Sequence, residues 1–401
     1  MSIATEITRL QNDSAAIAAA IAAKGVTVPS GSGYDDYATL IGSISGGGGT
    51  DFDAWLKDGD THVWIEIRND YQLTQYLRIR MIGTIDWGDG SAKDSVNVTS
   101  YTTFNHTYAR QGKYRIDLHP TSGTFYVGGG AQGYNIMGTR SNSTYYRNSA
   151  MYQVEIGSSV ITTLSNYAFY YATGMRKLYI PKTITSVGTH ICYSCYDLIE
   201  VEFEDPSTIT TFTATNNFYY CHVLQNMTPW AFGGGAAALS SCIRNSYCLN
   251  DFYIPATSTS MAANTLANMY GLKHLWCLPT TPPTCADSTV FSGFPSATAI
   301  HVPYGSLSSY QAAAEWSTYA DRMVEAGTVT YTLTNCTRSN ITPMVAAGSS
   351  YTTTITPNSG KTLGTVTVKM GGVDITSTAY SDGVVTIASV TGNITITATA
   401  S

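Results

Sequence analysis

Three kinds of residue in this sequence have types and spacings suited to chemistry: cysteines, paired carboxylates and recurring tyrosines. Cys192 and Cys195 form a C-x-x-C spacing, which in other proteins binds zinc or carries out redox reactions. Cys221 repeats the position of Cys195, and all three cysteines fall where the chain is expected to face an apolar interior. No histidine stands at ligand spacing with a matching orientation, since His222 falls on an outward position. We therefore interpret the cysteines as buried thiols stacked in a column, and we expect no metal and no cofactor.

The carboxylate pairs give no stronger indication of catalysis. Asp86 and Asp89 lie in a turn sequence, Asp-Trp-Gly-Asp-Gly, without the further oxygen ligands that calcium needs. Glu202 and Glu204 alternate on the outward side of a predicted strand, and no partner cleft is implied. The sequence lacks the Gly-x-Ser-x-Gly, His-Glu-x-x-His, P-loop and dinucleotide-binding motifs. We expect a protein that binds rather than catalyses, with no catalytic residues.

The tyrosines are more informative, because they recur at fixed offsets on positions expected to face outward. Aromatic side chains give a large contact area at low entropy cost, and stacked rings suit sugars as well as protein partners. Two other interpretations stay open: the rings pack on a neighbouring subunit, or they are ordinary solubilising residues of a β-surface. The residues that we expect to bind a ligand are Tyr193, Tyr196, Tyr219, Tyr247, Tyr270 and Trp276.

An internal repeat must position these residues. Its anchor residue recurs every 23 to 26 residues, which is the signature of a solenoid. Apolar or small side chains stand six and three residues before the anchors from the second onward, and apolar residues alternate after most of them. These positions are predicted to stack inside, because no repeat can bury its apolar face alone. The anchors are Met151, Met175, Leu198, Leu224, Leu249, Leu272 and Ala297.

The repeat resembles the BspA-type leucine-rich repeat. Residues 178–188, Leu-Tyr-Ile-Pro-Lys-Thr-Ile-Thr-Ser-Val-Gly, are similar to the pattern of that family. Residues 299–323 resemble the terminal cap that follows such repeats. We expect the solenoid and its caps to span 128–326. We also expect irregular curvature at 230–238, where Trp-Ala-Phe-Gly-Gly-Gly-Ala-Ala-Ala replaces the usual turn.

The segment before the solenoid, 51–127, alternates in polarity as a series of strands does. It carries Ile-Asp-Trp-Gly-Asp-Gly-Ser at 85–91, Phe-Asn-His-Thr-Tyr at 104–108 and Gly-Lys-Tyr at 112–114. These motifs resemble those of PKD-type β-sandwich domains, in which they are structural. The resemblance implies that the two aspartates of the turn brace it rather than bind a metal.

The two ends of the chain carry further resemblances. Residues 327–401 form an all-β unit with turn signals at Asn-Ser-Gly, Gly-Gly and Asp-Gly. This unit resembles the small Ig-like modules that close many surface and virion proteins of phages infecting Gram-positive bacteria. Residues 1–45 resemble the N-terminal attachment segment of phage fibre-like proteins, and 46–50 are a glycine linker.

The opening segment also contains a heptad seam. Isoleucine at both seam positions favours more than two strands, so we expect homo-oligomerisation, most readily as a trimer. Ser14 weakens the seam, and a small monomeric helical hairpin is the alternative. The seam residues are Ile3, Ile7, Leu10, Ile17 and Ile21.

Composition and charge restrict the partners. Only 12% of the 401 residues are charged and the net charge is −6, which argues against nucleic acid because phosphate binding needs clustered Lys and Arg. The N-terminus lacks the basic start and apolar core of a secretory signal. The sequence contains no run of about 18 apolar residues, so we expect no membrane span.

Together these observations predict a mainly β protein: a helical segment, a PKD-like β-sandwich, a leucine-rich-repeat solenoid and an Ig-like β-sandwich. We expect a phage virion protein on the particle surface, a tail or baseplate adhesin or fibre that binds a host surface glycan or protein. Its N-terminal segment would contact other virion proteins. The alternatives are a capsid head fibre or decoration protein, and an adhesin on the bacterial cell surface.

Overall fold

The computed structural model describes residues 54–127, 134–139, 150–229 and 238–401, together with positions 15, 18 and 28–30. The heptad residues of the N-terminal segment lie outside the described residues, so the oligomerisation seam stays a prediction. These residues are Ile3, Ile7, Leu10, Ile17 and Ile21.

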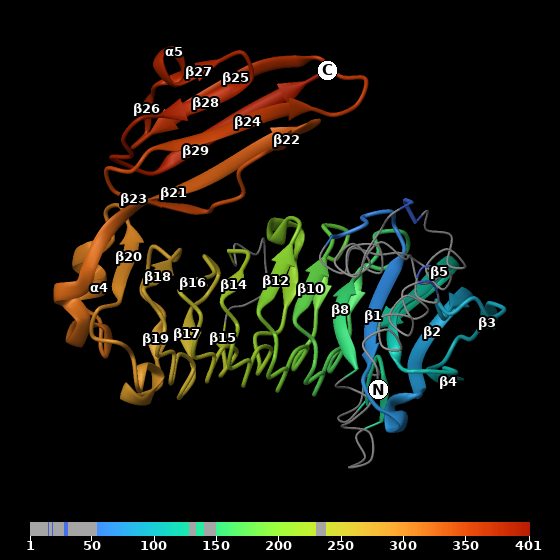
Figure 1. The fold of residues 1–401 in the computed structure, drawn as a ribbon. Helices are drawn as coiled ribbons and strands as arrows, with labels where there is room; N and C mark the ends of the chain where they lie inside the picture. Colours follow the sequence, from blue (N-terminus) through green and yellow to red (C-terminus); the bar gives the residue numbers. More distant parts are fainter. Residues whose placement is uncertain are drawn as a thin grey trace.

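The predicted solenoid is present, and one of its sides is a row of parallel strands (Figure 1). Neighbouring strands pair in register, so that Leu178 lies beside Val201 and Phe252 beside Leu275, and all four side chains are buried. We call this side the strand face. Its strands are β8 (Met151–Glu155), β10 (Lys177–Ile180), β12 (Glu200–Phe203), β14 (Asn226–Met227), β16 (Asp251–Ile254), β18 (His274–Cys277) and β20 (Ala299–Pro303).

A second row of two-residue strands runs along another side of the solenoid. Each of the first three strands contributes one inward apolar residue, Leu164, Val187 or Phe212, and these pair in parallel register. The row comprises β9 (Thr163–Leu164), β11 (Ser186–Val187), β13 (Thr211–Phe212), β15 (Ala238–Leu239), β17 (Ser260–Met261) and β19 (Thr284–Cys285).

The inward columns predicted from the repeat are confirmed, with one exception at its end. Phe169, Phe218 and Leu266, each six residues before an anchor, are fully buried. The seventh anchor is wrong: Ala297 is exposed, whereas Thr298 is buried. The Thr298 hydroxyl donates to the carbonyl oxygen of Leu272 at 2.7 Å, which satisfies it inside the fold. The inward position of the turn therefore moves by one residue, whereas the strand register is kept, because Ile300 still pairs with Leu275.

The cysteine column is buried and bonded to the backbone of preceding repeats. The Cys195 thiol donates to the carbonyl oxygen of Phe169 at 3.1 Å, and the Cys221 thiol donates to that of Cys192 at 3.2 Å. Ser246 makes the same kind of bond one repeat further on. All eight cysteines are unpaired, and burial raises the pKa of the Cys192 and Cys221 thiols. The column is thus a buried structural feature of the repeats.

The strand face is interrupted in the fourth repeat, where the sequence predicts irregular curvature. One sheet ends at β14, and the next begins at β16. Among the described residues, an isolated bridge between Thr215 and Ser240 continues the second row across this point. Most of the unusual stretch 230–238 lies outside the described residues.

The N-terminal strands and the solenoid share one sheet. Strand β1 pairs antiparallel with β5 on one side and with β8 of the first repeat on the other. A single apolar core accordingly runs from these strands through the repeats. The strands are β1 (Thr61–Ile67), β2 (Thr74–Asp86), β3 (Asp94–Asn97), β4 (Thr102–Thr107) and β5 (Gly112–Val127), with a 3-10 turn η1 (Asp70–Gln72) and a hairpin of β6 (Tyr134–Asn135) and β7 (Gly138–Thr139).

The Asp-Trp-Gly-Asp-Gly turn is braced as predicted. The Asp86 carboxylate accepts from the backbone N–H of Gly88 at 2.9 Å, and Asp89 accepts from that of Ser91 at 3.0 Å. Asp89 also contacts His106 at 2.7 Å. Both aspartates thus have structural partners. The finer PKD-type assignment stays a prediction.

The last repeat is closed by a short cap in the region where the sequence resembles one. Buried Tyr310 donates its hydroxyl hydrogen to the carbonyl oxygen of Pro279 at 2.8 Å, and the indole N–H of Trp316 donates to that of Pro283 at 2.9 Å. These bonds hold the cap on the end of the core. The elements here are α4 (Leu307–Ala312) and η4 (Trp316–Arg322), and earlier turns are η2 (Pro206–Thr208) and η3 (Ser288–Phe291).

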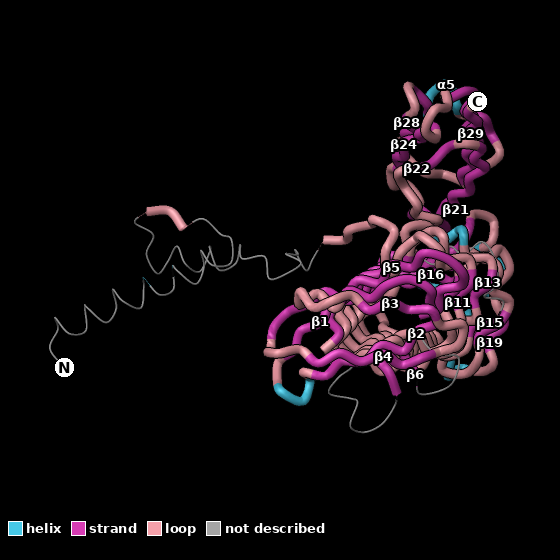
Figure 2. Tube along the Cα trace, turned by 90° about the vertical axis from the view of Figure 1, so that its right-hand side faces the viewer, coloured by secondary structure: helices cyan, strands magenta, loops and turns pink. Residues whose placement is uncertain are grey.

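The C-terminal unit is built of two sheets over their own core. Strand β21 (Met323–Thr334) belongs to both this unit and the solenoid, because it pairs with β20 through its first residues and with β29 through its last. The unit stands over the solenoid in both Figure 1 and Figure 2. Its other elements are β22 (Cys336–Arg338), β23 (Met344–Ala346), β24 (Tyr351–Pro357), β25 (Leu363–Met370), β26 (Val373–Asp374), α5 (Thr376–Ala379), β27 (Tyr380–Ser381), β28 (Val384–Ile387) and β29 (Ile394–Ala400).

Candidate recognition surface

The turns between the second row of strands and the strand face carry a connected group of aromatic rings. The rings come from four positions of the repeat, which lie eight, five, four and two residues before the anchor, and all but Tyr170 are at least partly exposed. Every ring contacts at least one other member. We call this group the ring surface; it consists of Tyr167, Tyr170, Tyr171, His190, Tyr193, Tyr196, Tyr219, Tyr220, His222, Tyr247 and Tyr270.

One row of the ring surface runs through four successive repeats. The rings of Tyr196 and His222 lie 5.2 Å apart with 24° between their planes, and those of His222 and Tyr247 lie 4.8 Å apart at 10°. Tyr270 continues the row at 5.4 Å from Tyr247 and 25°. The in-register repeat places equivalent residues about 5 Å apart, which is the spacing that offset-stacked rings prefer.

A second row lies beside the first. Tyr193 stacks on Tyr170 at 5.1 Å and on Tyr219 at 5.1 Å, in the latter case with only 9° between the planes. The Arg244 guanidinium closes this row, 5.5 Å over the Tyr219 ring. Tyr220 connects the rows, because its edge contacts both Tyr219 at 4.2 Å and His222 at 5.6 Å.

The backbone beneath the rings is held in a left-handed conformation at two positions in each of five repeats. Tyr171 and Tyr220 have φ values of 58° and 64°, and Asn245 and Asn268 occupy the equivalent position with 63° and 61°. The second left-handed position lies four residues earlier, as at Tyr167 with 64°. Asparagine tolerates this region, whereas a bulky residue is strained there. Strain of this kind often marks a functional segment.

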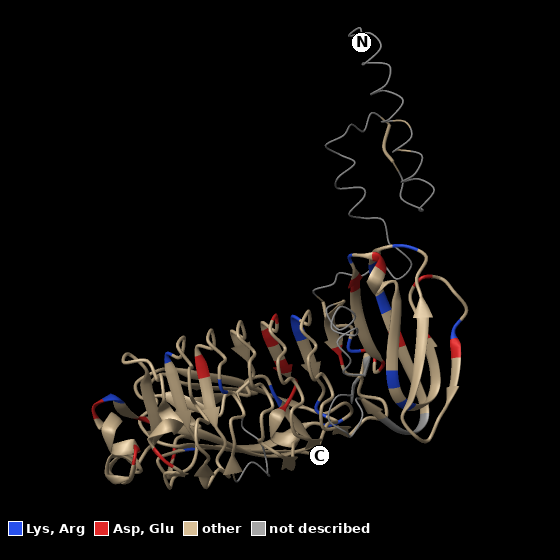
Figure 3. Ribbon diagram, turned by 90° about the horizontal axis from the view of Figure 1, so that it is seen from below, with Lys and Arg blue, Asp and Glu red and all other residues tan. Residues whose placement is uncertain are grey.

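The ring surface has little charge near neutral pH. Burial lowers the pKa of His190 and of His222, so both imidazoles are neutral there. Burial also raises the pKa of Tyr193 to about 12, which keeps its hydroxyl protonated. Charged residues are widely spaced along the solenoid (Figure 3). The surface thus offers apolar ring edges and hydroxyl groups to a partner.

The exposed part of the ring surface lies at the two ends of the first row. Tyr270 is 59% exposed and Tyr196 is 39% exposed, whereas the rings between them are half-buried because each covers the faces of its neighbours. Interior rings therefore present edges and hydroxyls, and the end rings present more of their faces. This arrangement suits an extended ligand that lies along the row.

The structure brings together five of the six residues predicted to bind a ligand: Tyr193, Tyr196, Tyr219, Tyr247 and Tyr270. It does not bring Trp276 to them. That indole lies on the strand face, stacked on His301 at 3.8 Å, and its N–H donates to Asp251 at 2.9 Å. The two positions differ because Trp276 follows its anchor, on the strand, while the tyrosines precede their anchors.

Sequence reasoning missed the rings at the left-handed positions, Tyr167, His190, Tyr171 and Tyr220. Their fixed offsets from the anchors were visible, and so was the asparagine at the same offsets in later repeats. Among the described residues, no three of His, Cys, Asp and Glu gather closely enough to hold a metal ion. Nor does the described part of the chain contain a helix long and apolar enough to cross a membrane.

Comparisons with known proteins bear on the repeats. Residues 139–273 match the sequence model of the BspA type leucine rich repeat region, in six copies, so this part of the chain carries such repeats. No curated protein matches the chain. A crystal structure of a leucine rich cell surface protein from Faecalibacterium prausnitzii is similar at 20% identity, with a TM-score of 0.31, over 38% of this chain and 44% of that one. The present chain therefore spans less than half of the length of that protein.

Proposed function

We propose that this protein is a recognition protein displayed on a surface, and that its ring surface binds an extended glycan or a protein segment on another cell. It acts by binding and not by catalysis. The observation that carries the proposal is the continuous stacking of rings through successive repeats, from Tyr196 to Tyr270. Rings that hold one another in place lose little further freedom when a ligand binds, which favours affinity.

The chemistry of the surface supports a neutral, elongated ligand. Tyrosine edges and hydroxyls contact both the apolar C–H faces and the hydroxyl groups of sugars, and they also serve protein interfaces. A few anchors usually carry most of the binding energy. The most exposed rings, Tyr196 and Tyr270, are therefore the expected anchors.

The site of display is the finer part of the proposal. The match of the repeats to the BspA type supports the adhesin on a bacterial cell surface better than the phage virion protein. In either setting the N-terminal segment would provide attachment and, through its heptad seam, trimerisation. Immunogold labelling of cells and of purified phage particles from the same culture distinguishes the two: label confined to cells supports the adhesin, and label confined to particles overturns it.

The binding test uses the double variant Tyr196→Ala/Tyr270→Ala. Purified protein is titrated onto intact Gram-positive cells and onto their isolated cell-wall glycan. We expect affinity to fall at least tenfold, because a stacking ring contributes about 1–3 kcal/mol. The matched control is Tyr71→Ala, which removes a tyrosine that is 82% exposed on the N-terminal unit.

Thermal unfolding of each variant shows whether the fold is intact. Unchanged adsorption by a folded double variant would move the receptor site away from the ring surface. An equal loss in the Tyr71 variant would show that the adsorption is non-specific.

A further inference from the structure

The seven residues before β1, 54–60, form a strap across the strand face of the first repeats. The Trp55 indole N–H donates at 2.7 Å to Glu202, which lies on β12 in the third repeat. The backbone N–H groups of Leu56 and Lys57 both donate to the carboxylate of Glu155, in the former case at 2.7 Å. At its other end the strap is held by Asp58, which contacts buried His62 at 2.9 Å.

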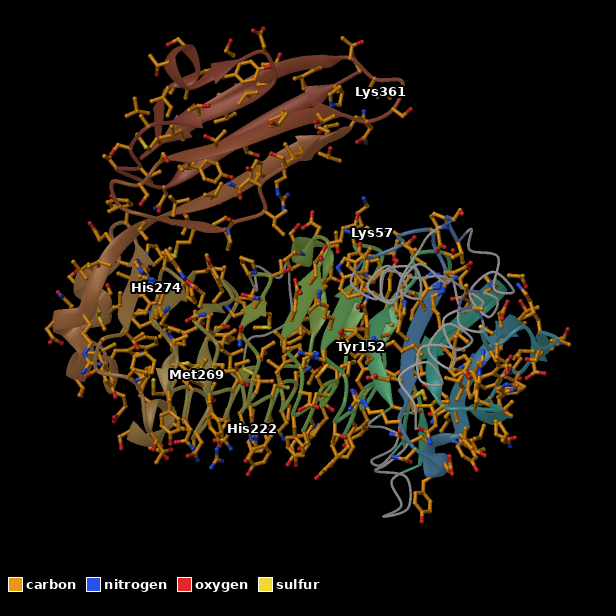
Figure 4. The ribbon with its side chains drawn as sticks, viewed as in Figure 1. Lys57, Tyr152, His222, Met269, His274 and Lys361 are labelled. Atoms are coloured by element: carbon orange, nitrogen blue, oxygen red, sulfur yellow. The ribbon has the colours of Figure 1, made fainter. Side chains whose placement is uncertain are left out.

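A pocket of about 230 Å³ opens between the strap and the first two repeats. In Figure 4 the pocket residue Lys57 is labelled at the upper edge of the solenoid, and His222 of the ring surface is labelled at the lower edge. The pocket and the ring surface are thus separate sites. The residues that matter for its chemistry are Lys57, Glu155, Ile156, Pro181, Lys182, Thr183 and Glu204.

The charged side chains of this lining already have partners. The Lys182 ammonium lies 2.9 Å from Glu204. Lys57 lies 3.2 Å from Glu202 and 4.6 Å over the ring of Tyr179. Glu155, which is 1% exposed, is satisfied by the strap backbone. A charged ligand would have to enter without a free counter-charge, which is unfavourable in a partly enclosed site.

One polar group in the lining has no partner. The hydroxyl oxygen of Thr183 is buried and makes no hydrogen bond. Thr257 occupies the same place in a later repeat, eight residues after its anchor, and its hydroxyl also has no partner. The two sites differ in that the pocket beneath the strap includes Thr183 and does not include Thr257.

We propose that the strap pocket binds a single uncharged sugar residue, as a site additional to the ring surface. Its volume suits one ring, and the ion pairs place donors and acceptors side by side, as neighbouring sugar hydroxyls require. Ile156 and Pro181 offer an apolar wall to the C–H groups of the ring. Rotation about χ1 of Thr183 would turn its buried hydroxyl toward the bound sugar as a hydrogen-bond partner.

The test uses the full chain with ¹³C-labelled isoleucine methyl groups, so that Ile156 reports on the pocket by NMR. The probes are methyl β-glucoside and N-acetylglucosamine, with glucuronate and glucosamine as anionic and cationic counterparts. We expect the uncharged sugars to shift the Ile156 methyl signal in a saturable way. The isosteric change Thr183→Val should weaken this binding about fivefold, the effect of one lost hydrogen bond.

Thr257→Val is the matched control, and it should leave the titration unchanged. No saturable shift with either uncharged sugar would overturn the proposal, as would stronger binding of a charged probe. An equal loss in both threonine variants would also contradict it. The Tyr196/Tyr270 double variant should keep the Ile156 response, so failure of the ring surface and failure of the strap pocket are distinguishable.

Discussion

The strand face and the ring surface both carry stacked aromatic rings, but the two stacks differ in what covers them. On the strand face, Tyr253 stacks on Trp276 at 5.7 Å and 8°, and Trp276 stacks on His301. Tyr253 and Trp276 also pack against a small apolar cluster that contains residues of β21 and β23. On the ring surface the equivalent stack ends in exposed tyrosines.

The difference shows that stacking alone does not identify a recognition site. Any in-register solenoid places equivalent side chains about 5 Å apart, so an aromatic position in consecutive repeats will stack. Exposure provides the distinction. The strand face is partly covered by the strap at Glu155 and Glu202, and Asp205 beside it pairs with Arg338 of the C-terminal unit at 3.1 Å.

The largest expected effect separates the two stacks by stability. Trp276→Ala should destabilise the protein by about 2–4 kcal/mol, because it removes a half-buried stacked ring and leaves Asp251 without its indole partner. Tyr270→Ala should cost less than about 1 kcal/mol, because that ring is largely exposed. Urea unfolding followed by circular dichroism measures both. A similar loss of unfolding free energy in the two variants would contradict the distinction between the strand face and the ring surface.

Acidification should also act mainly on the strand face. Burial and neighbouring His274 lower the pKa of His301 from 6.5 to about 4, although Asp251 opposes the shift. The folded protein therefore holds a neutral imidazole while the unfolded chain takes up a proton. The free energy of unfolding is not reduced by His301 above pH 6.5. It falls as the pH drops toward 4, by up to about 3 kcal/mol.

Comparison of variants isolates this contribution from other acid-sensitive groups. His301→Gln should flatten the decline of unfolding free energy between pH 6.5 and 4. His222→Gln on the ring surface should change it less, because that imidazole is less buried. A steeper decline in the His301 variant would show that the histidine does not oppose protonation in the folded state.

The smallest expected effect concerns strain beneath the rings. Tyr220→Asn places a residue suited to the left-handed backbone where Asn245 and Asn268 stand in later repeats. The relief of strain and the loss of the Tyr219 contact should nearly cancel, so stability should change by less than about 1 kcal/mol. Binding to cells should nevertheless weaken if the ring is kept for recognition. Unaltered binding, measured beside the unfolding curve, would make Tyr220 a surface residue without that role.

The repeat could be predicted from the sequence because its inward positions are chemically uniform. Phe169, Phe218 and Leu266 share one column, and only apolar side chains satisfy it. The outward tyrosines could be assigned to one face for the same reason. Trp276 was grouped with them because of its residue type. Its position after the anchor places it on β18, which belongs to the strand face.

Other features depend on contacts between distant segments, which a periodic pattern does not encode. The strap has no repeat of its own, and its position depends on Glu155 and Glu202, about 100 and 147 residues away. The left-handed turns were hard to predict from the residue types at those positions. Tyr171 and Tyr220 occupy positions where asparagine would have been a clearer signal.

Strand β21 has a mechanical consequence. It is one uninterrupted strand that pairs in parallel with β20 through Met323–Ala326 and with β29 through Val329–Thr334. Tension applied between the solenoid and the C-terminal unit along the strand direction loads both ladders in shear, so several hydrogen bonds must break together. Strand β1 joins the N-terminal sheet to the first repeat differently, because it lies between β5 and β8 and pairs antiparallel with both. A load is therefore transmitted between the last repeats and the C-terminal unit through backbone hydrogen bonds of one continuous strand.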